Sequence, residues 1–379
     1  MNKSTKKNNR DRPVRVAQIM GKHVTGGIKS VIMNYYKNID RDVIQFDFFV
    51  DADSPLKNYS DIHELGGNVY EIPPVRVLWK YIPELRKILK REKYLIAHGY
   101  INTLNIFPML AAMLAGVPVR IAENLSTAHP GEKKTILKNL LKPFSRFFAT
   151  QLAANSNFSG EWLYGQNNLP KCLILRNAID LDTFQYDPVL RLKTRKTFGL
   201  EDNFVIGHIG RYHYQKNHEF LIEIFKEVHQ LDKSSRLMLI GYGELKDSIL
   251  KKIEQLGLRN CVIDLGCRED IAQFYNAMDC FVLPSFYEGL PVVGIEAQAS
   301  GLPCVMSAEI TKETKITGLA EFVGLEKTAE VWARKIIKWK SFARQDVKEQ
   351  AAASGYNIKE EAHKLERFYL DALDTSKGE

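Results

Sequence analysis

Short apolar runs alternate with longer amphipathic segments along most of the chain. Continuous apolar runs of strand length are typical of parallel strands that are covered on both faces, and apolar residues at helical spacing predict helices between them. The predicted strands are Val14–Met20, Phe46–Val50, Val69–Ile72, Leu95–His98, Val119–Ala122, Leu152–Asn155, Phe204–Ile209, Arg236–Ile240, Val262–Leu265, Cys280–Leu283 and Cys304–Met306. This alternation predicts an α/β protein with two Rossmann-like, doubly wound domains.

The predicted helices lie between these strands. They are Ile28–Lys37, Ile82–Arg91, Leu104–Ala115, Thr135–Phe148, Glu219–His229, Leu245–Leu256, Ile271–Ala277 and a helix opening at Pro291. The stretch Asn177–Asp187 breaks the rhythm and indicates a linker. We therefore expect an N-terminal domain over residues 1–183, with 1–12 disordered, and a C-terminal domain over 184–354. Residues 355–379 carry a helix, Ile358–Leu370, that we expect to return to the first domain. Two facing domains would place a ligand in a deep cleft between them, at the carboxyl ends of the strands.

Composition and charge narrow the function classes. The 379 residues are 45% hydrophobic, which suffices for two cores, and no apolar run approaches the roughly 20 residues of a membrane helix. The first residues lack the apolar region of a secretion signal, so we expect a cytoplasmic protein. The net charge of +8 favours an anionic partner, which is a nucleotide, a membrane surface or nucleic acid. No nucleic-acid-reading motif is present, so nucleic acid is the least favoured. The five cysteines lack metal-ligand spacing and are interpreted as reduced: Cys172, Cys261, Cys267, Cys280 and Cys304.

The stretch Asp279–Ser307 carries the most informative pattern. It reads as a buried strand, a loop and a helix whose first position suits Pro291. Gly289 permits close backbone approach, and the free N–H groups and positive dipole end of a helix start favour an anion. Two carboxylates, Glu288 and Glu296, flank this place. Since they would repel a phosphate, sugar hydroxyls are their natural ligands.

A basic loop follows the strand that ends at Ile209. Gly210 and Arg211 come directly after the strand, and Lys216 stands just before the next helix. One forked and one point-like cation at a strand's carboxyl end could clamp a diphosphate. A solvated basic loop is the alternative, but it does not explain the glycines that frame Arg211.

Further glycine loops stand at other strand ends. Gly26 and Gly27 lead into a helix without the spacing of a dinucleotide or ATP motif, so an ordinary tight turn and a phosphate or sugar contact both stay open. Gly241 and Gly243 could hold a base and ribose through backbone groups, with Arg268 stacked on the base.

Taken together, these residues resemble glycosyltransferase family 4, retaining enzymes of the GT-B fold, and within it the bacterial capsular and exopolysaccharide transferases. The resemblance is carried by Glu288 and Glu296 in FYEGLPVVGIEAQASGLP, by the Gly210–His218 and Gly241–Glu244 segments and by Gly26-Gly27. It implies metal-independent transfer, without a cofactor, from a nucleotide-diphosphate sugar, expected to be a UDP-sugar. The implied acceptor is lipid-linked or an oligosaccharide, in cell-surface polysaccharide biosynthesis.

The resemblance also implies roles for single residues. Glu296 would hold the ribose hydroxyls and Glu288 a hydroxyl of the donor sugar, and both Arg211 and Lys216 would neutralise the diphosphate as the nucleotide leaves. The implied catalytic residues are thus Arg211, Lys216 and Glu288. The implied donor-binding residues are Gly26, Gly27, Gly210, Gly241, Gly243, Arg268, Gly289, Leu290, Pro291 and Glu296.

The first domain departs from the family pattern. Similar sequences commonly carry histidines after the strand that ends at Ala122, whereas this chain has Glu123–Ser126. His98, Glu123 and His129 are the substitute acceptor-side candidates. The departure motivates an alternative, a non-catalytic GT-B subunit that assists a partner transferase. A nucleotide-sugar epimerase of the same fold is another.

Asp51-Ala52-Asp53 follows a predicted strand and spells the DxD pattern that binds a divalent ion in transferases of a different fold. The other motifs describe basic phosphate ligands instead. We therefore interpret this pattern as a polar loop and expect no metal.

Residues 132–148, EKKTILKNLLKPFSRFF, interleave basic and apolar residues, with Pro143 placed to kink a helix. Such a segment could lie on the anionic inner face of the plasma membrane and bring the protein to a lipid-linked acceptor. It could equally be an ordinary domain helix whose apolar stripe faces its own sheet. The sequence leaves both readings open.

Overall fold

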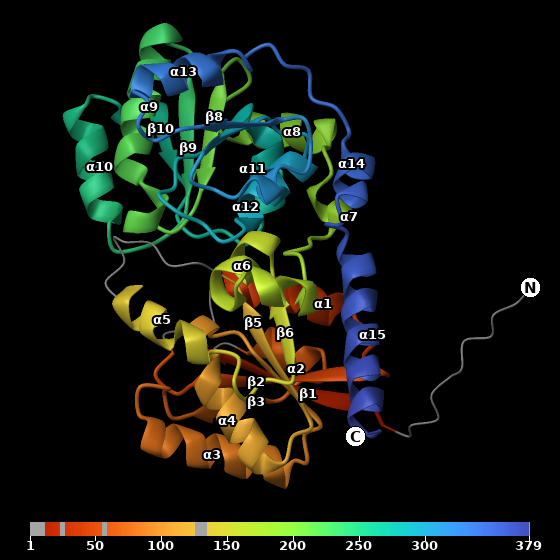
Figure 1. The fold of residues 1–379 in the computed structure, drawn as a ribbon. Coiled ribbons are helices and arrows are strands. Elements are labelled where there is room, and N and C mark those ends of the chain that lie inside the picture. The colour runs from red at the N-terminus through yellow and green to blue at the C-terminus, as the bar shows by residue number, and fades with distance from the viewer. Residues whose placement is uncertain (1–11, 23–26, 55–58, 126–134, 379) are drawn as a thin grey trace, which may run out of the picture. The chain divides into compact units, whose positions relative to one another are not determined.

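The computed structural model describes residues 12–22, 27–54, 59–125 and 135–378 (Figure 1). The chain divides into two compact units. Unit 1 comprises the described part of Met1–Arg176 together with Ile358–Glu379, and unit 2 comprises Asn177–Asn357. Ile179, near the start of unit 2, forms a parallel bridge with Asn357, the last residue of that unit.

The described strands of unit 1 form one sheet in the order β3-β2-β1-β4-β5-β6-β7, and every described pairing is parallel. The strands are β1 (Val14–Gly21), β2 (Ile44–Asp51), β3 (Val69–Ile72), β4 (Ile96–Gly99), β5 (Val119–Asn124), β6 (Gln151–Ala154) and β7 (Cys172–Ile174). The sequence did not predict β7, which has three residues and is only partly buried.

The helices of unit 1 cover this sheet. They are α1 (Gly27–Asn38), α2 (Ser60–Glu64), α3 (Leu78–Arg91), α4 (Ile106–Ala115), α5 (Thr135–Leu141), α6 (Asn157–Tyr164) and α15 (Ile358–Ser376), with 3₁₀ turns η1 (Asn102–Asn105), η2 (Lys142–Phe144) and η3 (Gln166–Lys171). The predicted single helix Thr135–Phe148 is wrong, because α5 ends at Leu141 and continues as η2. Pro143 explains the break, since proline has no N–H and its ring clashes with the preceding turn.

The described strands of unit 2 form a parallel sheet in the order β10-β9-β8-β11-β12-β13. They are β8 (Val205–Ile209), β9 (Arg236–Ile240), β10 (Val262–Asp264), β11 (Cys280–Leu283), β12 (Cys304–Ser307) and β13 (Ala320–Val323). The chain runs outward from β8 to β10 and then returns to the other side of β8 as β11. This change of direction makes the carboxyl ends of β8 and β11 the switch point at which doubly wound sheets bind ligands.

Helices cover both faces of the unit 2 sheet. Val282 packs into one buried apolar cluster, whereas its neighbours Phe281 and Leu283 pack into another. The helices are α7 (Leu181–Phe184), α8 (Pro188–Thr197), α9 (His218–Leu231), α10 (Lys246–Gln255), α11 (Ile271–Ala277), α12 (Val292–Ala299), α13 (Ala329–Ile337) and α14 (Lys348–Ala353), with 3₁₀ turns η4 (Tyr214–Lys216), η5 (Arg259–Cys261) and η6 (Lys312–Thr314). Pro291 caps α12 rather than opening it. The prediction of two doubly wound parallel α/β units is confirmed.

Candidate active site

Two predicted residues meet at the switch point of unit 2. Lys216 Nζ lies 2.6 Å from Glu288 Oε1. Gln215 Nε2 donates hydrogen bonds to Glu288 Oε2 and to the carbonyl of Tyr287, both at 3.0 Å. The loop after β11 is tied to the loop after β8 by the backbone N–H of Phe286, which donates to the Gln215 carbonyl at 2.9 Å. The buried Glu288 carboxylate is thus held by one ammonium and one amide.

Glu296 projects from α12, and only 5% of its surface is exposed. The Tyr275 hydroxyl donates to Glu296 Oε2 at 2.8 Å. Burial raises the pKa of Glu296 to about 7, while the hydrogen bond from Tyr275 acts in the opposite direction by favouring the ionised form. Such a carboxylate gains from further donors, and ligand hydroxyls are suited to supply them.

Arg211 and the start of α12 offer donors without internal partners. The Arg211 side chain is exposed and forms no hydrogen bond or ion pair with any described residue. Likewise, the backbone N–H groups of Gly289 and Leu290 have no hydrogen-bond partner in the described part of the chain. The Leu290 carbonyl is fixed by Asn177 Nδ2 at 2.8 Å. These groups are available to an anion.

The predicted donor-binding glycines have a packing reason of their own. A Cβ on Gly241 would lie 2.0 Å from the Gly210 carbonyl oxygen, and one on Gly243 would lie 2.4 Å from that of Tyr212. A Cβ on Gly210 would lie 3.2 Å from Lys216 Cδ. Glycine at these positions therefore lets the loops after β8 and β9 approach each other and leaves room for the lysine stem.

Arg268 is engaged within the chain. Its Nε and Nη2 atoms donate to the two Asp270 carboxylate oxygens at 2.8 and 2.6 Å. The guanidinium carbon lies 5.3 Å from the centroid of the Phe274 ring. A base that stacked on Arg268 would thus compete with an existing stack.

A pair of buried histidines lies beneath the basic loop, and the sequence interpretation missed it. His208 Nδ1 donates to the Val282 carbonyl at 2.8 Å, and burial lowers its pKa to about 4. His218 stacks on Tyr212 with ring centroids 4.3 Å apart, and burial lowers its pKa to about 2. Both rings are therefore neutral near pH 7. They fix the two ends of the loop without adding charge beside Lys216, a role that no sequence signal reveals.

Two acceptor-side candidates lie inside the core of unit 1. His98 Nδ1 lies 2.8 Å from the Tyr369 hydroxyl of α15 and 3.0 Å from that of Tyr100. Its Nε2 lies 2.9 Å from Glu123 Oε2, although without the alignment of a hydrogen bond. The Tyr100 hydroxyl donates to Gln18 Oε1 at 2.7 Å. In this structure the two side chains are parts of a buried network.

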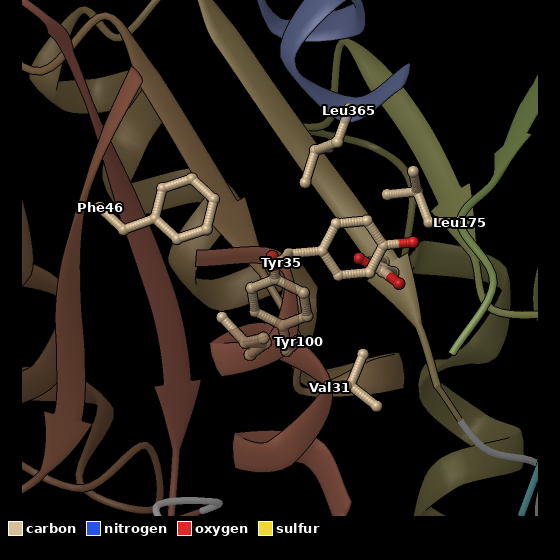
Figure 2. Close-up of a pocket in the computed structure, with 8 residues that line it drawn as sticks. Val31, Tyr35, Phe46, Tyr100, Leu175 and Leu365 are labelled. Atoms are coloured by element: carbon tan, nitrogen blue, oxygen red, sulfur yellow. The ribbon is translucent and has the colours of Figure 1, made fainter. Parts of the chain in front are cut away.

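A small cavity adjoins this network. Tyr35, Tyr100, Leu175 and Leu365 point into it, and Glu123 also lines it (Figure 2). Its volume of about 10 Å³ is at most that of one water molecule, so it has no room for a sugar.

The remaining predicted residues are placed as follows. Gly26 and His129 lie outside the described residues, and Gly27 is the first residue of α1.

Asp53 of the DxD pattern lies 2.6 Å from Lys22 Nζ and 2.8 Å from Arg76 Nη2, and the Lys22 hydrogen bond lowers its pKa. Asp51 is buried, which raises its pKa to about 6. Within the described ranges, no group of three or more His, Cys, Asp or Glu residues is suited to a metal ion. No described helix has the length and apolar character to cross a membrane.

Two doubly wound parallel units, with cations and carboxylates gathered at the switch point of the second, define the GT-B class. The family described as glycosyl transferases group 1 matches residues 191–359. EpsF of Bacillus subtilis, which is described as a glycosyltransferase, is 31% identical over 368 residues, which cover 94% of this chain and 96% of EpsF. The chain belongs to the group 1 glycosyl transferases, so the predicted GT-B and transferase assignments are confirmed.

Two further comparisons cover most of the chain. An Escherichia coli enzyme is 28% identical over 78% of this chain and 79% of its own length, and its name describes an α-1,3-galactosyltransferase that uses UDP-Gal and a GlcNAc-diphosphoundecaprenol acceptor. The crystal structure of Anabaena HepE in complex with UDP and glucose matches with a TM-score of 0.74 at 19% identity, over 96% of this chain and all of that chain. This structural likeness supports the fold.

Proposed function

We propose that this protein is a retaining, metal-independent glycosyltransferase that takes its sugar from a UDP-sugar. Its acceptor is lipid-linked or an oligosaccharide, and its pathway is cell-surface polysaccharide biosynthesis. Support comes from the E. coli relative, whose name specifies a UDP-sugar and a lipid-linked acceptor, and from HepE, which was crystallised with UDP and glucose.

The observation that carries this proposal is the Lys216–Glu288 pair, together with an exposed Arg211 that has no side-chain partner among the described residues. Arg211 and Lys216 neutralise the diphosphate, while Glu288 accepts a hydrogen bond from a donor-sugar hydroxyl. The 2.6 Å contact between Lys216 and Glu288 supports this assignment, because the sugar and its phosphate are joined and their binding groups must be adjacent. Glu296 accepts hydrogen bonds from the ribose hydroxyls.

In the reaction, the bond between the anomeric carbon and the β-phosphate oxygen breaks, and a bond to the acceptor oxygen forms on the same face. The acceptor proton passes to a phosphate oxygen, and UDP leaves. The contribution of the protein is electrostatic. Arg211, Lys216 and the N–H groups of Gly289 and Leu290 stabilise the charge that develops on the departing diphosphate.

Calorimetric titration with UDP, UDP-glucose, ADP and GDP tests the donor assignment. We expect uridine nucleotides to bind and Glu288→Gln to weaken UDP-glucose more than UDP, because only the sugar contacts Glu288. Glu254→Gln, at an exposed position on α10, is the matched control. Binding of no nucleotide, or equal losses for both ligands, would contradict the assignment.

Product analysis separates the alternatives. A transferase releases UDP from UDP-sugar in the presence of an acceptor, an epimerase alters the sugar without any acceptor, and a non-catalytic subunit does neither.

A further inference from the structure

Several apolar side chains of α5, η2 and the turn that follows are exposed. Ile136 and Leu140, one turn apart on α5, are 84% and 66% exposed. Phe144 and Phe147 are 42% and 59% exposed, and their rings pack edge to face. These four side chains do not belong to the core of unit 1, so an ordinary domain helix does not account for them.

Contacts with the rest of unit 1 hold this segment in place. Ser145 is buried, and its hydroxyl donates to the Lys142 carbonyl at 2.8 Å. Phe148 packs against the core of unit 1. Lys142 Nζ lies 5.2 Å from the centroid of the Trp162 ring of α6, and Arg146 Nη1 donates to Asn168 Oδ1 at 2.9 Å. The outward apolar side chains therefore form a fixed surface.

All charged side chains of the same segment are basic. Lys138, Lys142 and Arg146 are interleaved with the exposed apolar residues, and residues 135–150 contain no aspartate or glutamate. The centres of protein–protein interfaces are depleted in lysine, whereas lysine and arginine next to exposed leucine and phenylalanine suit the boundary between lipid headgroups and acyl chains. Charge complementarity thus favours an anionic lipid surface over a protein partner.

We propose that this α5–η2 surface, formed by Ile136, Leu140, Phe144 and Phe147 with Lys138, Lys142 and Arg146, docks on an anionic lipid bilayer. The apolar side chains enter the headgroup region, and the basic groups contact lipid phosphates. The docking goes beyond the proposed transfer reaction and does not depend on it, because it needs neither a donor nor an acceptor. In Figure 1, α5 and α15 lie on opposite sides of unit 1.

Vesicle co-sedimentation of the full chain tests the proposal. We expect binding to vesicles of phosphatidylcholine mixed with phosphatidylglycerol at low salt, weaker binding to phosphatidylcholine alone, and release as salt screens the charges. The apolar variant Ile136→Ser/Leu140→Ser/Phe147→Ser should lose about tenfold in partition coefficient per substitution. The charge variant Lys142→Gln/Arg146→Gln should lose about fivefold per charge, and only on anionic vesicles.

A matched control comes from unit 2. Val189, Leu192 and Leu231 are 75%, 64% and 51% exposed, so their replacement by serine removes comparable apolar surface from another unit of the chain. This control variant should bind vesicles as the wild type does. Thermal unfolding verifies the folding of each variant, and unchanged UDP affinity of the apolar variant separates this test from that of the donor site.

Several results would overturn the proposal. The first is that the wild type does not bind anionic vesicles at low salt. The second is that the apolar and control variants lose vesicle binding equally, and the third is that the protein binds neutral and anionic vesicles equally well. A change of oligomeric state in the apolar variant with vesicle binding retained would instead assign the surface to contact between copies of the chain.

Discussion

Replacing Glu296 by glutamine should stabilise unit 2 at neutral and alkaline pH. The carboxyl group has a pKa of about 7 in the folded protein because it is buried, against 4.5 for an ordinary glutamate. Below pH 4.5 the carboxyl group is protonated in both the folded and the unfolded protein, so the free energy of unfolding has its full value. Between the two values the unfolded chain releases the proton while the folded chain retains it, so stability falls as pH rises until it levels off above the folded pKa.

The size of the effect follows from the two pKa values. One pKa unit corresponds to about 1.4 kcal/mol, so the interval from 4.5 to about 7 gives a loss of about 3 kcal/mol. Glutamine has nearly the same shape and does not titrate. The Glu296→Gln variant should therefore gain stability over the wild type as pH rises, which corresponds to an unfolding midpoint about 6–12 °C higher near pH 8 for a domain of this size.

Thermal and denaturant unfolding at a series of pH values measure this difference. The exposed Glu254→Gln control should show no such divergence. Tyr275→Phe removes the hydrogen bond that favours the ionised form and so raises the pKa of folded Glu296 further, which should extend the divergence to higher pH and enlarge it. If the unfolding free energies of the wild type and Glu296→Gln changed with pH in parallel, the inference that Glu296 is buried and keeps its proton near neutral pH would be refuted.

Donor binding should change in the opposite direction. Loss of charge-assisted hydrogen bonds to the ribose is worth about 1.5–3 kcal/mol, so Glu296→Gln should weaken UDP-glucose about 10- to 150-fold. For the wild type, affinity for UDP-glucose, whose phosphates do not titrate in this range, should increase as pH rises through about 7. An affinity independent of pH would contradict the ribose assignment.

Three further predictions concern the phosphate site and its loops. Arg211→Ala and Lys216→Ala should each lower turnover about 100-fold or more, measured as UDP release, and near-normal turnover in both would remove them from the reaction. Gly241→Ala should cost about 1–3 kcal/mol in unfolding free energy, because its Cβ would lie 2.0 Å from the Gly210 carbonyl oxygen; an unchanged denaturation midpoint would show that the loops adapt. Transfer should persist in the presence of EDTA, and activity that is lost and then restored by magnesium or manganese would establish a metal requirement.

The sequence predicted the parts of the fold that depend on local pattern and on topology. Lys216 and Glu288 are 72 positions apart, yet their meeting follows from two strands that end at one switch point. The edge strands β7 and β13 were missed because they are short and partly exposed. Strands of three or four residues are too short for a pattern of apolar and polar positions to be recognised.

Side-chain environment was the less predictable part of the site. The burial of His98 and Glu123 depends on packing against α15, which is remote in sequence. The elevated pKa of Glu296 depends on tertiary burial that no spacing encodes. Gly241 and Gly243 were predicted to hold a base and ribose through backbone groups, and that stays a prediction; their close packing against the Gly210 and Tyr212 carbonyls depends on another loop and was not foreseen.

The assembly of unit 1 from two separate parts of the chain has a consequence for biosynthesis. The described strands of its sheet all precede residue 175, whereas α15 follows the whole of unit 2. During translation, Gln18 and His98 therefore lack their hydrogen-bond partner, the Tyr369 hydroxyl. It is synthesised only after the sheet of unit 1 has been followed by about another half of the chain. Unit 2 is continuous in sequence and can fold as it emerges, while unit 1 reaches its native state only when α15 leaves the ribosome. A nonsense mutation before Ile358 would thus damage unit 1, although its described strands all lie upstream of the mutation.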